Sequence, residues 1–207
     1  TQYGGNTGSY KVLDSLTTLG FHFPKRASFF KRELEEFLLL CREEGLNPRD
    51  PTGSYAGAMG KSQFISSSYR AYAVDGDNDK KRDLWNSNAD IINSVANYFA
   101  RHGWKDSPLI TAKTTVSGEA YKTLLNTSLK PVHTIQELKQ HQVNVPTDLP
   151  GDTRVKLLEL NQVDQAEYWL AFDNFYTITR YNHSHLYAMA VYQLSQEIKN
   201  GVLAAKY

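Results

Sequence analysis

Three things are scarce in this sequence: cysteine, long apolar runs and net charge. Its 207 residues include one cysteine, Cys41, so no disulfide can form within the chain. No apolar run approaches the roughly 18 residues that a membrane-spanning helix needs. The formal net charge is +1, which provides no bulk attraction for nucleic acid or for an anionic membrane surface. We therefore expect a globular chain with no nucleic-acid partner and no transmembrane segment.

Several common catalytic motifs are missing as well. The six histidines form no HExxH zinc pattern, and the spacing of His183 and His185 is weak for metal ligation. The sequence contains neither a Walker phosphate loop nor a dinucleotide fingerprint. Cys41 ends an apolar run and has no catalytic context nearby, so we expect a small buried side chain. These absences argue against zinc peptidases, nucleotide-dependent enzymes and thiol enzymes.

The pattern of apolar residues predicts a mostly helical α+β fold. We expect helices over residues 9–19, from a cap at Ser28 to Gly45, from a cap at Ser87 to Gly103, over 134–140 with Thr134 as cap, and over 184–199. Three short segments predict strands. Residues 155–160 are rich in leucine and begin with a valine, and residues 168–172 and 175–179 are rich in aromatic and β-branched residues. We expect a helical core over residues 1–104, a small α+β insertion over 105–165, and a return to the core over 166–207.

A glycine-rich segment at residues 53–64 is the first candidate site. Gly53, Gly57 and Gly60 permit positive φ angles and close backbone approach. Ser54 and Gln63 would then stand in a shallow, small-walled place that suits an extended polar ligand. Taken alone, the segment fits a structural loop before a buried helix equally well.

A second candidate site is rich in tyrosine. Tyr181 and Asn182 are followed by Tyr187 in an aromatic stretch, and aromatic residues make up 12% of the chain. Tyrosine suits sugars, because its ring face packs on C–H groups while its hydroxyl bonds to sugar hydroxyls. The alternatives are burial on a helix face for Tyr187 and a turn or cap for Asn182. The two segments together indicate a carbohydrate cleft.

An acidic loop at residues 75–83 resembles the oxygen-ligand pattern of an EF-hand. Alternate carboxylates repel one another, which favours a bound Ca²⁺, although nearby basic residues also allow a solvated charged loop. Position six of the pattern is Lys80, where glycine usually supplies a positive φ, and position twelve is Asn86, which removes the bidentate glutamate. We therefore expect weak, structural Ca²⁺ binding. The candidate ligands are Asp75, Asp77, Asp79, the carbonyl of Lys81, Asp83 and, as the best remaining carboxylate, Asp90.

These segments together resemble the membrane-bound lytic murein transglycosylase B family. The resemblance is carried by residues 54–60 with Gln63 and Phe64, and by residues 83–85, 94–99, 102–104, 175–182 and 187–194. It runs from Thr1 to about Leu194 and is weakest between 105 and 165. It implies a lysozyme-like fold and cleavage of the β-1,4 bond between N-acetylmuramic acid and N-acetylglucosamine in peptidoglycan, which leaves a 1,6-anhydro end.

The resemblance also implies roles for single residues. Ser54 would orient the catalytic acid and the substrate, and Asn182 would hold the N-acetyl group or the developing charge. The other cleft residues it implies are Gln63, Tyr98, Tyr181 and Tyr187, with Met59 and Phe64 as an apolar wall. The acidic loop matches the EF-hand-like Ca²⁺ site of the family.

The catalytic glutamate of the family precedes a motif that resembles residues 1–4, so it would lie directly before Thr1. We therefore expect this chain by itself to be inactive. The alternatives are a peptidoglycan-binding module without turnover and a hydrolysing muramidase. The resemblance implies a periplasmic location, with an outer-membrane anchor an open alternative, and we expect a monomer.

Overall fold

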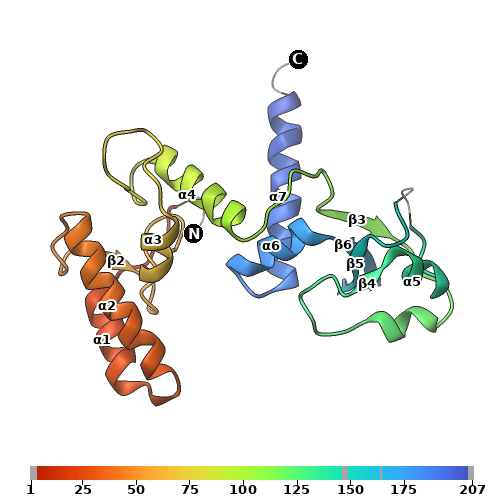
Figure 1. The fold of residues 1–207 in the computed structure, drawn as a ribbon, viewed down its shortest axis with the longest axis horizontal. Helices are drawn as coiled ribbons and strands as arrows, with labels where there is room; N and C mark the ends of the chain where they lie inside the picture. Colours follow the sequence, from red (N-terminus) through yellow and green to blue (C-terminus); the bar gives the residue numbers. More distant parts are fainter. Residues whose placement is uncertain (1–3, 146–148, 164, 205–207) are drawn as a thin grey trace. The chain divides into compact units, whose positions relative to one another are not determined.

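The computed structural model describes residues 4–145, 149–163 and 165–204. The chain divides into two compact units, residues 1–101 and 102–207, whose elements are labelled in Figure 1. Each unit is described by itself. The boundaries expected from the sequence, at 104 and 165, stay a prediction.

The first unit is mostly helical. Helices α1 and α2 lie side by side as an antiparallel hairpin (Figure 1). Its core is built from apolar residues of both helices, including Val12, Leu16, Phe37 and Leu40, each at most 1% exposed. The elements are β1 (Tyr10–Lys11), α1 (Val12–His22), a 3₁₀ turn (Pro24–Arg26), α2 (Ala27–Glu43), β2 (Thr52–Gly53), α3 (Ser66–Tyr72) and α4 (Asn88–Arg101).

One buried carboxylate joins two of these helices. Glu33 on α2 is 5% exposed, and its oxygens accept hydrogen bonds from the backbone N–H of Ser67 at 2.9 Å and from its hydroxyl at 2.7 Å. Ser67 lies in the first turn of α3, where backbone N–H groups lack helical partners and the helix dipole favours negative charge. Glu33 therefore fixes the start of α3 against α2.

The second unit combines an antiparallel sheet with helices. The sheet order is β3-β6-β5-β4, with Leu157 opposite Leu170 and Leu158 opposite Trp169. The elements are β3 (Thr111–Thr114), a 3₁₀ turn (Ala120–Leu124), β4 (His133–Thr134), α5 (Ile135–Gln140), β5 (Arg154–Asn161), β6 (Ala166–Ala171), α6 (Asp173–Tyr181) and α7 (His185–Ala204).

Both faces of this sheet are buried. Leu157 packs with Ile135 and Leu138 of α5, whereas its neighbour Leu158 packs with residues of α6 and α7, including Phe175. Successive side chains on a strand point to opposite faces, so a strand covered on both sides is apolar along most of its length. This explains why residues 155–158 of β5 are all buried.

Most expected elements are confirmed, and two details were wrong. Residues 175–179 lie within helix α6, not in a strand. Their β-branched and aromatic residues favour a strand, but the burial of Phe175, Ile178 and Thr179 at helical spacing outweighs that preference. Helix α2 begins at Ala27, so Ser28 is not its cap. Both Thr134 and Ser87 accept the hydrogen bonds expected of helix caps.

Candidate functional site

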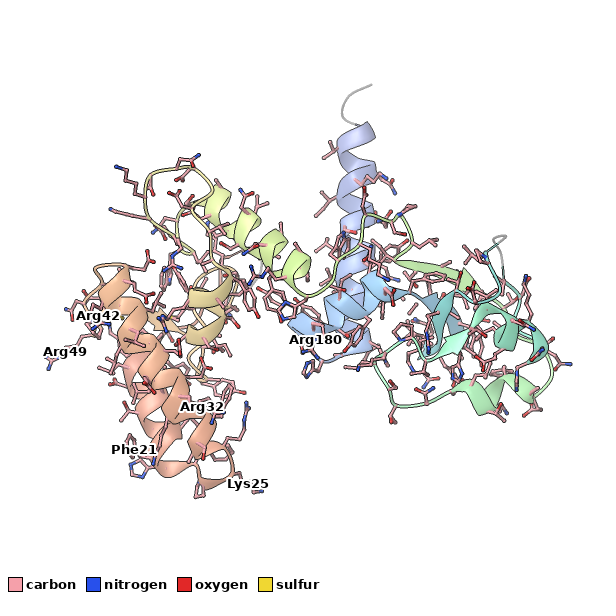
Figure 2. The ribbon with its side chains drawn as sticks, viewed as in Figure 1. Phe21, Lys25, Arg32, Arg42, Arg49 and Arg180 are labelled. Atoms are coloured by element: carbon pink, nitrogen blue, oxygen red, sulfur yellow. The ribbon has the colours of Figure 1, made fainter. Side chains whose placement is uncertain are left out.

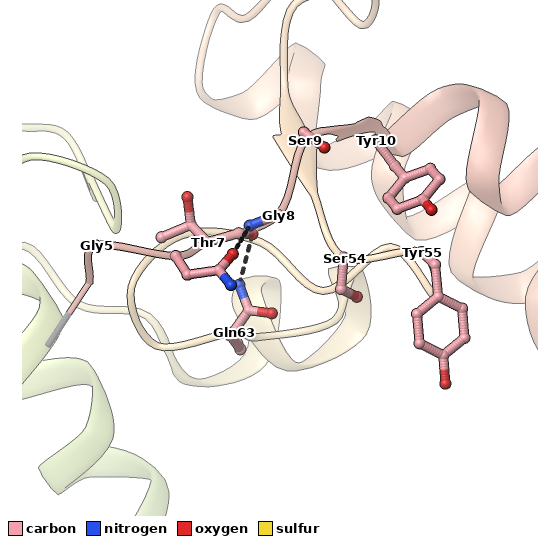
Figure 3. A pocket seen from close by; sticks show the side chains of 9 residues that line it. Gly5, Thr7, Gly8, Ser9, Tyr10, Ser54, Tyr55 and Gln63 are labelled. Atoms are coloured by element: carbon pink, nitrogen blue, oxygen red, sulfur yellow. Dashed lines mark hydrogen bonds between the residues drawn. The ribbon is translucent and has the colours of Figure 1, made fainter. Parts of the chain in front are cut away.

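A cavity of about 640 Å³ in the first unit lies where two segments far apart in sequence meet (Figure 3). Strand β1 pairs with β2, with Tyr10 opposite Gly53, and this pairing brings residues 5–10 beside the glycine-rich segment. The lining is small and polar. It consists of Gly5, Asn6, Thr7, Gly8, Ser9, Tyr10, Ser54, Tyr55 and Gln63.

Close backbone packing around the cavity explains two of the glycines. Gly8 has a φ of +91°, and a Cβ at this position would lie 2.1 Å from the carbonyl oxygen of Gly53. Gly60 has a φ of +66°, and its Cβ would lie 2.4 Å from the carbonyl oxygen of Leu84. Any larger residue would be strained in conformation and would clash with backbone. Gly8 lines the cavity, and Gly60 lets the glycine-rich segment approach the backbone of Leu84.

Ser54 and Gln63, both expected site residues, line this cavity. The Ser54 Oγ accepts hydrogen bonds from the backbone N–H of Ala58 at 3.1 Å and of Ala56 at 3.3 Å. The Gln63 amide nitrogen donates to the carbonyl oxygens of Thr7 and Gly60, each at 2.9 Å, and the first of these bonds is drawn in Figure 3. Among the described residues, no partner is recorded for the Ser54 hydroxyl hydrogen or the Gln63 Oε1. The cavity therefore offers a donor and an acceptor in fixed positions.

None of the nine lining residues carries a carboxyl group. The lining can bind hydroxyl and amide groups through hydrogen bonds and can pack a tyrosine ring on an apolar face. A carboxyl group for an acid–base reaction at this cavity has to come from outside these nine residues.

The expected apolar wall lies beneath this surface. Met59 is fully buried and Phe64 is 2% exposed, and their backbones exchange hydrogen bonds of 2.8 and 3.1 Å. The centroid of the Phe64 ring lies 5.8 Å from that of the Tyr98 ring, and Tyr98 is 9% exposed. None of the three lines the cavity, so direct contact with a substrate stays a prediction for them.

Sequence reasoning missed the segment at residues 5–10. A weak signal existed, because Asn6 and Thr7 lie between Gly5 and Gly8, a pattern of small and polar residues that is typical of a tight turn. The pairing of β1 with β2 is what turns this segment into a cavity wall.

The acidic loop brings three carboxylates together. One oxygen of each of Asp75, Asp77 and Asp90 lies within 4.8 Å of the others. Asp90 is fully buried, and its oxygens accept hydrogen bonds from the backbone N–H groups of Gly76 and Asp83, each at 2.7 Å. Oxygen ligands of this type suit hard cations such as Ca²⁺.

The other expected ligands have different contacts. The Asp79 carboxylate accepts a hydrogen bond from the backbone N–H of Lys81. Asp83 accepts hydrogen bonds from the Trp85 N–H and from the Asn86 side chain. Burial raises the pKa of its carboxyl group, but the hydrogen bonds together outweigh burial, so the pKa is lowered. Neither aspartate belongs to the three-carboxylate cluster. Their ligand roles, and that of the Lys81 carbonyl, stay predictions.

Lys80 adopts the conformation that its position in the loop requires. Its φ is +72°, although glycine is the usual residue for such an angle. Its backbone N–H donates to Asp75 Oδ2 at 2.8 Å. The EF-hand-like turn thus forms without its glycine, at some cost in backbone strain.

The tyrosine-rich segment belongs to the second unit. Asn182 is exposed and ends helix α6 in an extended conformation, and its carbonyl accepts a hydrogen bond from the Ser184 N–H at 2.7 Å. Tyr187 is partly buried against the α6–α7 cluster, and this burial raises the pKa of its hydroxyl. Tyr181, at the end of α6, is half-buried. A single site formed by these residues with Ser54 and Gln63 stays a prediction.

Comparison with known proteins identifies a consistent set of relatives. Residues 1–196 match the family described as the transglycosylase SLT domain. The chain is 42% identical over 198 residues to membrane-bound lytic murein transglycosylase B of Escherichia coli strain K12. That match covers 96% of this chain and 54% of the relative, so the chain spans about half the length of this curated protein.

Solved structures of lytic transglycosylases resemble this chain as well. Lytic transglycosylase SltB1 from Pseudomonas aeruginosa superposes with a TM-score of 0.93 at 45% identity, covering 97% of this chain and 66% of that one. Escherichia coli Slt35 in complex with calcium gives 0.89 at 41%, with coverages of 97% and 63%. Pseudomonas aeruginosa SltB3, in complex with NAG-anhNAM-pentapeptide, gives 0.81 at 30%, with coverages of 92% and 51%.

Proposed function

Because this chain belongs to the transglycosylase SLT domain family, whose solved members share its mostly helical, lysozyme-like fold, we propose that it is the core of a peptidoglycan lytic transglycosylase. The enzyme cleaves the β-1,4 bond between N-acetylmuramic acid and N-acetylglucosamine and leaves a 1,6-anhydro end. The observation that carries this proposal is the small, polar cavity lined by Ser54 and Gln63, which lie in the stretch that resembles the family signature.

The proposed chemistry needs one carboxyl group in two successive roles. As an acid it protonates the leaving glycosidic oxygen while the bond to the anomeric carbon breaks. As a base it then takes the proton of the muramic 6-hydroxyl, whose oxygen forms the new bond to the same carbon. A carboxyl group in a poorly solvated setting has the raised pKa that suits both steps. The lining of the cavity supplies no such group, which fits the expectation of a glutamate directly before Thr1.

The chain's own residues supply binding and orientation. Ser54 is held by two backbone N–H groups, which leaves its hydroxyl hydrogen to donate to the acid or to the substrate. Gln63 presents its Oε1 to a hydroxyl or amide N–H while its nitrogen ties the two walls together. We propose that Asn182, with Tyr181 and Tyr187, holds the N-acetyl group. The exposure of Asn182 at the end of α6 supports this role.

We propose that the acidic loop binds Ca²⁺ as a structural cation through Asp75, Asp77 and Asp90. The clustered carboxylates and the positive φ of Lys80 support this, as does the calcium complex of Slt35. The bound cation would neutralise the repulsion among three carboxylates and so stabilise the loop between α3 and α4.

The proposed substrate sets the expected location and partners. Glycan strands of the cell wall are the partner, and in the bacteria of the relatives this implies the periplasm. The curated relative is named membrane-bound, but among the described residues no helix has the length and apolarity to cross a membrane.

Product analysis tests the proposal. Purified peptidoglycan is incubated with this chain and with a version that carries a glutamate directly before Thr1 in an N-terminal extension, and the products are identified by mass spectrometry. We expect 1,6-anhydro-muropeptides from the extended version. Reducing muramic ends would indicate a hydrolysing muramidase instead. Peptidoglycan binding without release by either version would favour the non-catalytic binding module.

A matched pair of variants tests the second unit. Asn182→Ala in the extended version should lower the rate of anhydro-product release by at least tenfold, since one lost contact to developing charge has an effect of that order. Asn200→Ala, at an exposed position on α7, should leave the rate unchanged. Equal rates for the two variants would remove Asn182 from the proposed site.

A further inference from the structure

A second cavity adjoins the first along helix α1. It has a volume of about 310 Å³ and shares Tyr10 and Tyr55 with the larger cavity. The two cavities therefore meet at this pair of tyrosines. A ligand longer than the first cavity can continue into the second without leaving the surface of the first unit.

One face of α1 forms the floor of the second cavity. The lining residues Asp14, Ser15, Thr18 and Leu19 of α1 follow spacings of three and four along the chain, which places them on the same side of the helix. Lys11, the residue just before α1, completes this side of the lining. This face offers hydroxyl and carboxylate groups beside an apolar leucine. Its one basic and one acidic residue leave it without net charge, which suits a neutral, hydroxyl-rich ligand better than an ionic one.

The two tyrosines that both cavities share are largely exposed. Tyr10 is 60% exposed and Tyr55 is 72% exposed, and Figure 3 shows both rings on the same side of the larger cavity. Among the described residues neither ring stacks on another aromatic ring, and neither hydroxyl forms a hydrogen bond. Burial or packing within the described chain therefore does not explain them. A ring face with a polar tip matches a sugar, which has apolar C–H faces and peripheral hydroxyls.

We propose that Tyr10, Tyr55 and the adjoining face of α1 form an additional subsite for a β-1,4-linked N-acetylhexosamine strand. The strand extends from the larger cavity across the two rings, and Asp14 and Thr18 bond to its hydroxyl or acetamide groups. This inference rests on the proposed function and deepens it, because it assigns a preference for long glycans over short ones. The subsite contributes binding and takes no part in bond cleavage.

Length-dependent binding of oligosaccharides tests the subsite. The probes are β-1,4-linked N-acetylglucosamine oligomers of two to six sugars, titrated into the chain by calorimetry. We expect affinity to rise with length, and Tyr10→Ala combined with Tyr55→Ala to remove most of that rise. At about 25 cal/mol per Å², a ring face that covers roughly 50 Å² of apolar sugar surface changes the Kd by about tenfold, and binding costs reduce this to about fivefold to tenfold per ring.

A third exposed ring provides the control. Phe21, near the far end of α1 (Figure 2), is also 60% exposed and lines neither cavity. Phe21→Ala should bind every oligomer as the parent chain does. Tyr10→Phe and Tyr55→Phe keep the rings and should retain most of the gain with length. All variants should unfold close to the parent temperature, since surface substitutions rarely change stability by more than about 0.5 kcal/mol.

The outcomes separate this inference from the proposed function. If the hexamer binds the double alanine variant as tightly as the parent, the subsite is wrong, while product analysis with the extended version still decides the function. If no oligomer binds the parent chain at millimolar concentration, the subsite is also wrong, and so is the proposal that these cavities bind glycan. A loss confined to the long oligomers, with the dimer affected less than twofold, supports the subsite.

Discussion

The carboxylate of Asp90 is expected to hold the acidic loop closed, and Asp90→Asn tests this. Asp90 lies on α4 and is fully buried, and it accepts hydrogen bonds from Gly76 and Asp83 near the two ends of the loop. Asparagine has the same size but only one acceptor oxygen. The substitution therefore breaks one of these two bonds and turns an N–H donor toward a backbone N–H.

The magnitude follows from two opposing effects. A lost hydrogen bond to a charged acceptor, together with the unpaired buried N–H, costs about 3 kcal/mol. Removing the charge of Asp90 also relieves its repulsion with Asp75 and Asp77, which is worth about 1 kcal/mol in a largely hydrated loop. Without a cation the net loss is about 2 kcal/mol, or roughly 4–8 °C in Tm for a chain of this size. With a bound cation no repulsion is relieved and a ligand charge is lost, so the deficit should be larger.

Thermal unfolding followed by circular dichroism measures the loss in Tm without a cation, in EDTA, and with a cation, in millimolar CaCl₂. Asp106→Asn, at an exposed aspartate, serves as the control and should unfold within about 1 °C of the parent, as surface changes usually do. An Asp90→Asn Tm equal to the parent value in EDTA would show that the carboxylate does not hold the loop. Equal deficits in EDTA and in calcium would show that Asp90 contributes nothing to cation binding.

Two further predictions concern other parts of the chain. Burial, and then the nearby charge of Lys156, lower the pKa of His185 in the folded state. The unfolded chain therefore binds a proton more readily at this residue, and the protein should lose stability as the pH falls below about 6.5. His185→Gln should abolish that part of the loss when Tm is compared between pH 7 and pH 5. The same fall in Tm for the variant and the parent would refute this prediction. Gly60→Ala should lower the Tm by roughly 5–10 °C in the same assay, since the added methyl group would clash with the carbonyl oxygen of Leu84. An unchanged Tm would mean that the backbone at Leu84 moves aside at little cost.

Elements with a complete local signal could be predicted from the sequence. Thr134 starts α5 with a reciprocal capping box, in which its side chain and that of Glu137 each bond to the other's backbone, and both residue types are visible in the sequence at the required spacing. Helix α6 had no such signal, because its cap position, Phe172, makes no side-chain cap bond. Its strand-like composition was overruled by packing against β5 and α7, which no local rule contains.

The candidate site divides in the same way. Ser54, Gln63 and the acidic loop could be found because short segments contain their chemistry. The wall at residues 5–10 could not, since it becomes a wall only through the pairing of Tyr10 with Gly53, 43 positions away. The two exposed tyrosines were hidden for a related reason: a sequence shows that a ring is present but not whether a neighbour covers it.

Gln63 has a strained backbone conformation that fixes the direction of its side chain in the cavity. Its φ of +55° is unfavourable for a residue with a side chain, and a conformation of this kind costs about 1 kcal/mol or more. The same conformation lets the side-chain nitrogen bond to Thr7 and Gly60 at once, which offsets the cost and joins the two walls. Since the nitrogen is occupied by these bonds, the Oε1 is held in one direction before any ligand arrives. A polar group fixed in advance loses little entropy when it binds, so this strained conformation is consistent with the proposed role of Gln63 in binding a sugar amide or hydroxyl.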